Sequence, residues 1–420
     1  MLMTKAPIAD PALLNIPVGA RILGMRRIVS LVYAGHDVTP LWNELMQRVT
    51  ADPTAAAAFL DMAIILQTLG RSNEARQILK NAVQMRRDYC VVHGNGTGPR
   101  ILAFVTEGDF MANTPIDFLL AGSDCVLWLH YVDLQTFALV DLPEHDIAFM
   151  AIGESTENAP LLAHMQTLLA KFDGPVMNRN PGLIARLTRD GVSAMLANEP
   201  TILSPFTYRV SRADLMAVAM GVKRLDDCAP GLGYPLVVRP ISTHAGNGME
   251  RITDSVELVT FLKAQPAPEL YVAPFIDFRG SDGFYNKQRI VFINGKAFAS
   301  HMALSDHWIV HYLSAGMEQS AAKRAVEQAW MENFDQDFAL RHKESFRALC
   351  RHIPLDYFGI DCAELPDGRL LVFELDVAMV VHDMDDPIVY PYKQGAMRKL
   401  FDGFVDAARQ KAAAALGKAS

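Results

Sequence analysis

The segment that most constrains the fold lies at residues 357–379, YFGIDCAELPDGRLLVFELDVAM, where two apolar runs flank a Pro-Asp-Gly turn. Asp-Gly between alternating hydrophobic residues is typical of a β-hairpin. If the strands pair symmetrically about Asp367 and Gly368, Asp361 faces Glu374 on one side of the sheet, and Asp376 follows on that side. The opposite side would carry Ile360, Cys362, Phe373 and Leu375.

The three carboxylates pose an electrostatic problem, because neither strand contains a Lys or Arg except Arg369 at the turn. Like charges buried together raise one another's pKa values. One interpretation is a Mg²⁺ site of one or two ions, held by Asp361, Glu374 and Asp376 and completed by phosphate oxygens. The alternative is a partly exposed strand end with solvated acids.

The bulk properties indicate a globular protein of two or three domains. The chain has 420 residues, half of them hydrophobic, and a net charge of −8. Without a clustered basic region, we expect no nucleic-acid partner. The five cysteines are scattered, and no stretch reads as a signal peptide or a membrane span, so we expect a cytoplasmic protein without a membrane partner. The oligomeric state stays open.

The N-terminal region, residues 1–95, is expected to be helical. Within it, residues 57–84 place small and apolar side chains as in one helix–turn–helix, and this resembles a single tetratricopeptide unit. Such a hairpin either docks a protein partner or caps the rest of the chain by burying its apolar face. The positions that indicate it are Ala63, Leu66, Gly70, Ala75, Leu79 and Ala82.

Residues 96–200 are expected to form a small parallel α/β domain. HGNGTGPR, residues 93–100, is interpreted as a linker instead of a phosphate loop, because it precedes a strand and lacks the Lys-Ser/Thr ending. Short apolar runs and helical patterns then alternate. The expected strands are 100–106, 125–132, 146–152 and 174–178, and the helices are 114–122 and 157–172.

Two further segments indicate a phosphate site. A strand at 235–239 ends in Arg239 and leads to a turn rich in small residues, Ser242, Thr243, Gly246 and Gly248, whose backbone N–H groups can surround phosphate oxygens. Downstream, Lys287 and Arg289 alternate onto one face of a strand. Cations and Mg²⁺ around an anion are what phosphoryl transfer requires.

Over roughly residues 100–410, this order of parts resembles the ATP-grasp superfamily of carboxylate–amine ligases. More narrowly, DGFYNKQR, HMALSDHWIVHY and FELDVAMVVHD look like a bacterial subfamily that joins a tetratricopeptide segment to an ATP-grasp module. The resemblance implies an α+β / α/β fold. The α/β domain would precede two nucleotide-clamping lobes at residues 201–275 and 276–420.

The resemblance also implies roles for individual residues. Asp361, Glu374 and Asp376 match the metal-binding acids, although the last is usually Asn. Arg189 and Arg239 stand where two phosphate-contacting Lys residues are usual, and Arg289 matches a phosphate-contacting Arg; Arg239 and Arg289 would be the catalytic cations. The hinge that meets adenine would comprise Tyr271, Val272, Ala273 and Ile276, and Asp277 or Asp282 would bind ribose.

A histidine-rich insert lies between the cationic strand and the acidic hairpin. His301, His307, Trp308 and His311 either contact the substrate or pack as an ordinary loop, and His382 is placed with them. A zinc site at His307 and His311 is disfavoured because the β-branched neighbours do not suit a helix.

Three functions follow. The leading one is a ligase that uses ATP and Mg²⁺ to join a small-molecule or peptide carboxylate to an amine. The alternatives are a non-catalytic scaffold that binds proteins and whose nucleotide site is vestigial or only regulatory, and a small-molecule kinase.

Overall fold

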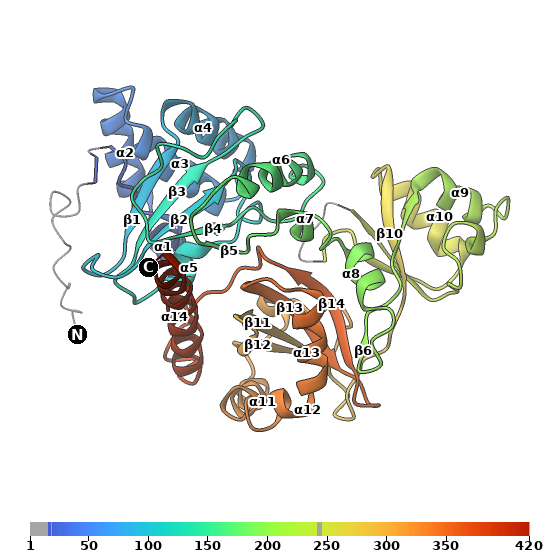
Figure 1. Cartoon of the computed structure of the whole chain (residues 1–420). Coiled ribbons are helices and arrows are strands. Elements are labelled where there is room, and N and C mark those ends of the chain that lie inside the picture. The colour runs from blue at the N-terminus through green and yellow to red at the C-terminus, as the bar shows by residue number, and fades with distance from the viewer. Residues whose placement is uncertain (1–15, 18, 242–245, 420) are drawn as a thin grey trace.

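The computed structural model describes residues 16–17, 19–241 and 246–419, which form a mixed α/β protein with three sheets (Figure 1). The N-terminal region contains α1 (Met25–Tyr33), α2 (Thr39–Ala51), α3 (Ala56–Thr68) and α4 (Ser72–Met85). Gly70 takes a φ of 76° at the turn between α3 and α4, a conformation open to glycine at no steric cost. The predicted helix–turn–helix is therefore confirmed, while its tetratricopeptide character stays a prediction.

The first sheet has the order β1-β3-β2-β4-β5, and all its pairs are parallel except β1 with β3. The prediction of helix up to residue 95 was wrong at its end, because Asp88–Val92 extends along β3 as an edge strand. The strands are β1 (Asp88–Val92), β2 (Arg100–Val105), β3 (Val126–Tyr131), β4 (Ile147–Met150) and β5 (Val176–Met177), and the helices are α5 (Ile116–Leu119), α6 (Ala159–Ala170), α7 (Pro181–Ile184) and α8 (Arg189–Leu196).

Residues 208–274 form a lobe around an antiparallel sheet of order β7-β10-β8-β9, with two helices packed on it. We call it the first lobe. Its core, which includes Leu215, Val238, Leu258 and Val272, contains no residue of the other sheets among those described. The elements are β7 (Tyr208–Ser211), α9 (Arg212–Ala219), β8 (Leu236–Pro240), β9 (Glu250–Ile252), α10 (Ser255–Ala264) and β10 (Glu269–Pro274).

The second lobe is built on a sheet of order β12-β11-β13-β14-β6, in which the short strand β6 is parallel to β14. Its C-terminal helix, α14 (Lys393–Ala419), packs on β12 and also on β4 and β5 of the first sheet (Figure 1). The remaining elements are β6 (Ile202–Leu203), β11 (Tyr285–Ile293), β12 (Lys296–Ser305), α11 (Ala321–Glu332), α12 (Phe338–Arg341), α13 (Lys343–His352), β13 (Tyr357–Glu364) and β14 (Leu370–Asp376).

The acidic hairpin pairs as predicted at its functional end, with Asp361 opposite Glu374. Nearer the turn the register is shifted, because Cys362 pairs with Val372 and leaves Phe373 as the extra residue of a β-bulge. Phe373 packs against the cluster around Phe278 instead of the apolar face where the symmetric hairpin would place it.

The hydrophobic cores show which parts of the chain pack together. Two large cores each combine residues of the first sheet and of the second lobe, and one of them also contains α3 and α4. The helical hairpin thus caps the chain: Ala63, Leu79 and Ala82 are buried in the same core as Ile101 and Phe404. Packing of this kind accounts for its apolar face without a partner.

Candidate functional site

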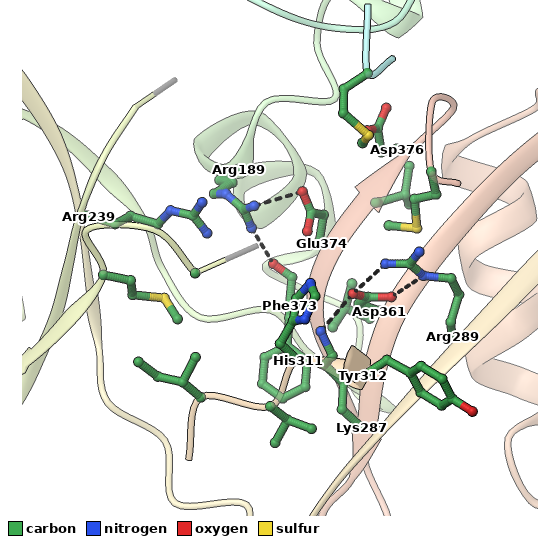
Figure 2. A pocket seen from close by; sticks show the side chains of 18 of the residues that line it. Arg189, Arg239, Lys287, Arg289, His311, Tyr312, Asp361, Phe373, Glu374 and Asp376 are labelled. Carbon is green, nitrogen blue, oxygen red and sulfur yellow. Dashed lines mark hydrogen bonds and ion pairs between the residues drawn. The ribbon is translucent and has the colours of Figure 1, made fainter. Parts of the chain in front are cut away.

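A cavity of about 610 Å³ lies between the two lobes, and the loops of the first sheet and helix α1 complete its wall. Its described cationic lining residues are Arg189, Arg239, Lys287 and Arg289 (Figure 2). These cations come from α8, β8 and β11, so segments far apart in the sequence bring them together.

Asp361 is held by two cations of the neighbouring strand β11. Arg289 donates from Nε to Oδ1 at 2.8 Å and from Nη2 to Oδ2 at 3.0 Å, and Lys287 Nζ donates to Oδ2 at 3.0 Å (Figure 2). Burial opposes ionisation of Asp361, but the charges of Arg289 and Lys287 outweigh it and set its pKa far below the usual range. The expectation of uncompensated acids was wrong here, because the compensating charges lie on β11, which pairs with β13.

Glu374 forms its ion pair with a different element, helix α8. Thr188 caps α8 by accepting the Gly191 N–H, which places Arg189 in the first turn of that helix. From there Arg189 Nη2 donates to Glu374 Oε1 at 2.7 Å, and Nη1 donates to the carbonyl oxygen of the bulged Phe373 at 3.1 Å (Figure 2). Burial would raise the pKa of Glu374, but the charge of Arg189 lowers it overall.

Arg239 projects from β8 of the first lobe into the same cavity (Figure 2). Its side chain is buried, and burial together with the charge of Arg189 lowers its pKa to about 10. Arg239 thus remains protonated at neutral pH, in a place where two like charges face one cavity. An anion between these two arginines would relieve their repulsion.

Asp376 differs from the other two acids because no described residue forms an ion pair with it. Its Oδ1 accepts the Ala378 N–H at 2.9 Å. Burial and the charge of Glu374 raise its pKa to about 7. A bound cation would displace the proton of this buried carboxyl and stabilise its ionised form.

The predicted Mg²⁺ ligands Asp361, Glu374 and Asp376 differ in how their oxygens are occupied. Within the described ranges, no group of three or more His, Cys, Asp or Glu side chains has the arrangement to hold a metal ion. Asp361 does not fit a Mg²⁺ ligand set while Lys287 and Arg289 hold both its oxygens. Glu374 and Asp376 do fit as oxygen donors beside phosphate oxygens, since neither Oε2 of Glu374 nor the carboxylate of Asp376 forms an ion pair with a described residue.

The β10 segment forms the cavity wall on the first-lobe side. The pairing of β10 with β7 ends at Val272, whereas its pairing with β8 continues to Pro274. Beyond Val272, the edge that faces away from β8 has no further β7 partner among the described residues. Tyr271, Ala273 and Ile276 line the cavity, and Tyr271 is fixed by a hydrogen bond from Arg209 Nη2 to its hydroxyl oxygen at 2.9 Å.

Several predicted residues lie elsewhere. Val272 is buried in the core of the first lobe. Asp277, Asp282, His307 and Gly248 do not belong to the described lining. Gly246 does line the cavity. Ser242 and Thr243 of the predicted phosphate turn lie outside the described residues.

The predicted substrate residues His301, Trp308, His311 and His382 all line the cavity. The ring of His301 stacks on Tyr312 with centroids 4.6 Å apart. Burial and the charge of Arg289 set the pKa of His301 well below its usual value, and burial also lowers the pKa values of His311 and His382. These imidazoles are therefore neutral at neutral pH.

Sequence reasoning missed other lining residues, among them Val29, Tyr33, Phe118 and Glu154. Glu154 follows β4, and the carboxyl end of a parallel strand is a general signal for site residues. No local pattern marks Val29 or Tyr33, because their place depends on how α1 docks.

No family model and no curated protein matches the chain. Among solved structures, it is similar to the D-alanine–D-alanine ligase of Bacillus anthracis complexed with ATP, at 15% identity and a TM-score of 0.43, over 75% of this chain and 98% of that one. It is also similar to the RimK domain ATP-grasp protein of Sphaerobacter thermophilus, at 14% identity and a TM-score of 0.39, over 73% of this chain and 99% of that one. A third similar structure is the VanG D-Ala:D-Ser ligase of Enterococcus faecalis, at 11% identity and a TM-score of 0.45, over 74% of this chain and 100% of that one.

All three TM-scores lie below 0.5. Among its described helices, none has both the length and the apolar character needed to cross a bilayer.

Proposed function

We propose that the protein is an ATP- and Mg²⁺-dependent ligase that activates a carboxylate as an acyl phosphate and joins it to an amine, with release of ADP and phosphate. The observation that carries the proposal is the set of four cations, Arg189, Arg239, Lys287 and Arg289, gathered from helix α8 and from both lobes around one cavity. A site that transfers a phosphoryl group needs such charge from several directions.

The cavity offers a place for each part of the nucleotide. The β10 edge at Ala273 to Ile276 can present backbone N–H and C=O groups to a flat base, and Arg189 and Arg239 would contact the phosphates. Glu374 and Asp376 would hold Mg²⁺, which when bound would neutralise charge on the transferring phosphoryl group. Ser242 and Thr243 remain predicted phosphate contacts.

The residues of the chain would act by position and charge. Asp361 fixes Arg289 through two hydrogen bonds, so the guanidinium meets the phosphoryl oxygens without reorganising. A substrate carboxylate oxygen would form the bond to the γ-phosphorus as the bond to ADP breaks. The amine nitrogen would then attack the acyl carbon, phosphate would leave, and the amine would lose its proton. No covalent protein nucleophile is required.

Calorimetry with a non-hydrolysable ATP analogue tests the nucleotide site directly. We expect Mg²⁺-dependent binding to the wild-type protein and at least tenfold weaker binding to Glu374→Gln, because that change removes a charge-assisted contact and a Mg²⁺ donor. Glu269→Gln, an exposed residue at the start of β10, is the matched control and should bind like the wild type. No binding to a folded wild-type protein would overturn the ligase function and favour a protein-binding scaffold whose nucleotide site is vestigial.

A second measurement separates ligase from kinase. Hydroxylamine converts an acyl phosphate into a hydroxamate, whereas a phosphorylated alcohol does not react. Turnover with ATP and a carboxylate should therefore yield hydroxamate if the proposal holds. A stable phosphorylated product and no hydroxamate would assign the kinase function.

A further inference from the structure

One part of the cavity wall is apolar and comes from segments outside the cationic group. Val29 and Tyr33 belong to α1, Phe118 to α5, and Met379, His382 and Met384 to the segment after β14. Their rings are contiguous, since the His382 ring lies 5.7 Å from that of Tyr33 and 6.3 Å from that of Phe118, measured between centroids. We call these six residues the apolar wall.

The apolar wall carries no net charge. His382 Nδ1 accepts the Met384 N–H at 3.2 Å, so Nε2 bears the proton and the ring is neutral. Asp385, a lining acid in contact with Tyr33, is already paired with Lys393 Nζ at 2.8 Å, and the Tyr33 hydroxyl donates to it at 3.3 Å. A charged group placed against this wall would lose hydration without a partner, whereas an apolar group would gain from burial.

The apolar wall is tied to the proposed chemistry. Arg289 Nη1 donates to the Val380 carbonyl oxygen at 3.0 Å, and Thr114 Oγ1 donates to the Val377 carbonyl oxygen at 2.8 Å. The segment after β14 is therefore anchored at once to a cation of the phosphoryl site and to the first-sheet domain. A substrate group that rests on Met379 lies beside the place where the carboxylate would be activated.

We infer that one of the two joined substrates presents an aromatic or branched aliphatic side chain to the apolar wall, and that Val29 and Tyr33 of α1 determine this preference. This inference rests on the proposed ligase function and adds a substrate class to it. It also gives α1 a role in substrate selection, in addition to its packing against α3 and α5.

The test measures phosphate release from ATP with pairs of amino acids as probes. L-phenylalanine, L-leucine, L-serine and L-aspartate share the amine and the carboxylate and differ only in the side chain. We expect pairs that contain L-phenylalanine or L-leucine to exceed all-polar pairs at least tenfold in kcat/KM. Because the result is a ratio between substrates, a smaller folded fraction in a variant does not change it.

Two variants of Tyr33 assign the preference to α1. Tyr33→Ser removes the ring and should lower the apolar-to-polar ratio about tenfold. Tyr33→Phe keeps the ring and loses only the contact with Asp385, so it should retain the ratio. Phe137→Ser, which removes an 89% exposed ring outside the cavity lining, is the matched control and should also retain it.

The failures can be told apart by the calorimetric measurement. If the analogue binds but L-serine or L-aspartate is used as well as L-leucine, or none of the four probes is used, the inference is overturned while the nucleotide site stands. An unchanged ratio in Tyr33→Ser would overturn the role of α1. Loss of analogue binding in the wild type would overturn the ligase function itself.

Discussion

Arg289 contacts both carboxylate oxygens of Asp361, although the two residues are 72 positions apart in the chain. The contact forms because β11 and β13 pair with Arg289 directly opposite Asp361. Asp361 therefore fixes a cation at the cavity wall, and of the three acids of the hairpin, Asp376 alone forms no ion pair with a described residue.

Replacing Asp361 should destabilise the fold. Asp361→Asn leaves Lys287 and Arg289 close together and without their counter-charge in a buried site, which is expected to lower the free energy of unfolding by about 3 kcal/mol. Chemical denaturation measures this change. Asp367→Asn at the exposed turn of the same hairpin is the control and should stay within about 0.5 kcal/mol. Equal stability of both variants would contradict the assigned pairing.

Arg239 should contribute to nucleotide affinity without a comparable effect on folding. Arg239→Gln removes a charge that would face the phosphates of the proposed nucleotide, and we expect the Kd of the ATP analogue to rise about tenfold or more. Lys263→Gln, on the exposed side of α10 in the same lobe, should leave the Kd unchanged. Calorimetry of both variants decides, and an unaltered Kd in Arg239→Gln would remove this residue from the phosphate site.

The Mg²⁺ dependence of binding should vary with pH through Asp376. Burial and the charge of Glu374 raise its pKa to about 7, and only the ionised carboxylate binds a cation well. The gain in affinity from Mg²⁺ is therefore expected to increase as the pH rises through about 7, and EDTA should abolish it. Asp376→Asn should flatten this pH profile, while the exposed Asp306→Asn should retain it. If the Mg²⁺ effect on binding keeps the same pH dependence in Asp376→Asn, Asp376 is not the group that causes it.

Asp61 should make stability decrease with rising pH. It is buried in α3, where its carboxylate accepts the Leu23 N–H at 2.9 Å and the Gly24 N–H at 3.3 Å. Burial raises its pKa from 3.8 to about 7. The contribution of Asp61 to the free energy of unfolding is thus complete below pH 3.8 and is lost as the pH rises through about 7. The free energy of unfolding should fall by about 4 kcal/mol over this range.

Unfolding curves across this pH range check the effect of Asp61. Asp61→Asn keeps an oxygen that can accept the Leu23 N–H and has no proton to lose, so its stability should fall less from pH 4 to pH 8 than that of the wild type. Asp173→Asn, which changes an exposed residue, should follow the wild type. If the free energy of unfolding of Asp61→Asn changes with pH as much as that of the wild type, Asp61 is not the source of the pH dependence.

The sequence predicted the acidic hairpin well because its information is local. Alternation of side chains and an Asp-Gly turn were sufficient to place Asp361 opposite Glu374. The bulge at Phe373 offsets the actual turn by one residue, and no local pattern reports it. The alternating Lys287 and Arg289 were also recognised, but their partner was not, because strand pairing between β11 and β13 is a long-range property.

Other differences have the same physical origin. Asp88–Val92 follows a helix without a clear stop signal, and it becomes a strand because β3 offers an edge for pairing. Val29 and Tyr33 carry no chemical signature in the sequence, and they line the cavity only because α1 docks beside α5. Local patterns predicted the elements, whereas tertiary contacts determine which side chains meet.

The separate core of the first lobe has a consequence for the dynamics of the protein. The described residues of this core all belong to the first lobe. In contrast, α14 and two shared cores join the second lobe to the first sheet. The first lobe is therefore expected to behave as an independent cooperative unit. In hydrogen exchange, amides of β8 and β10 should open at a lower free energy than those of β11 and β13. Nucleotide binding, which would bridge the two units, should bring these energies closer together.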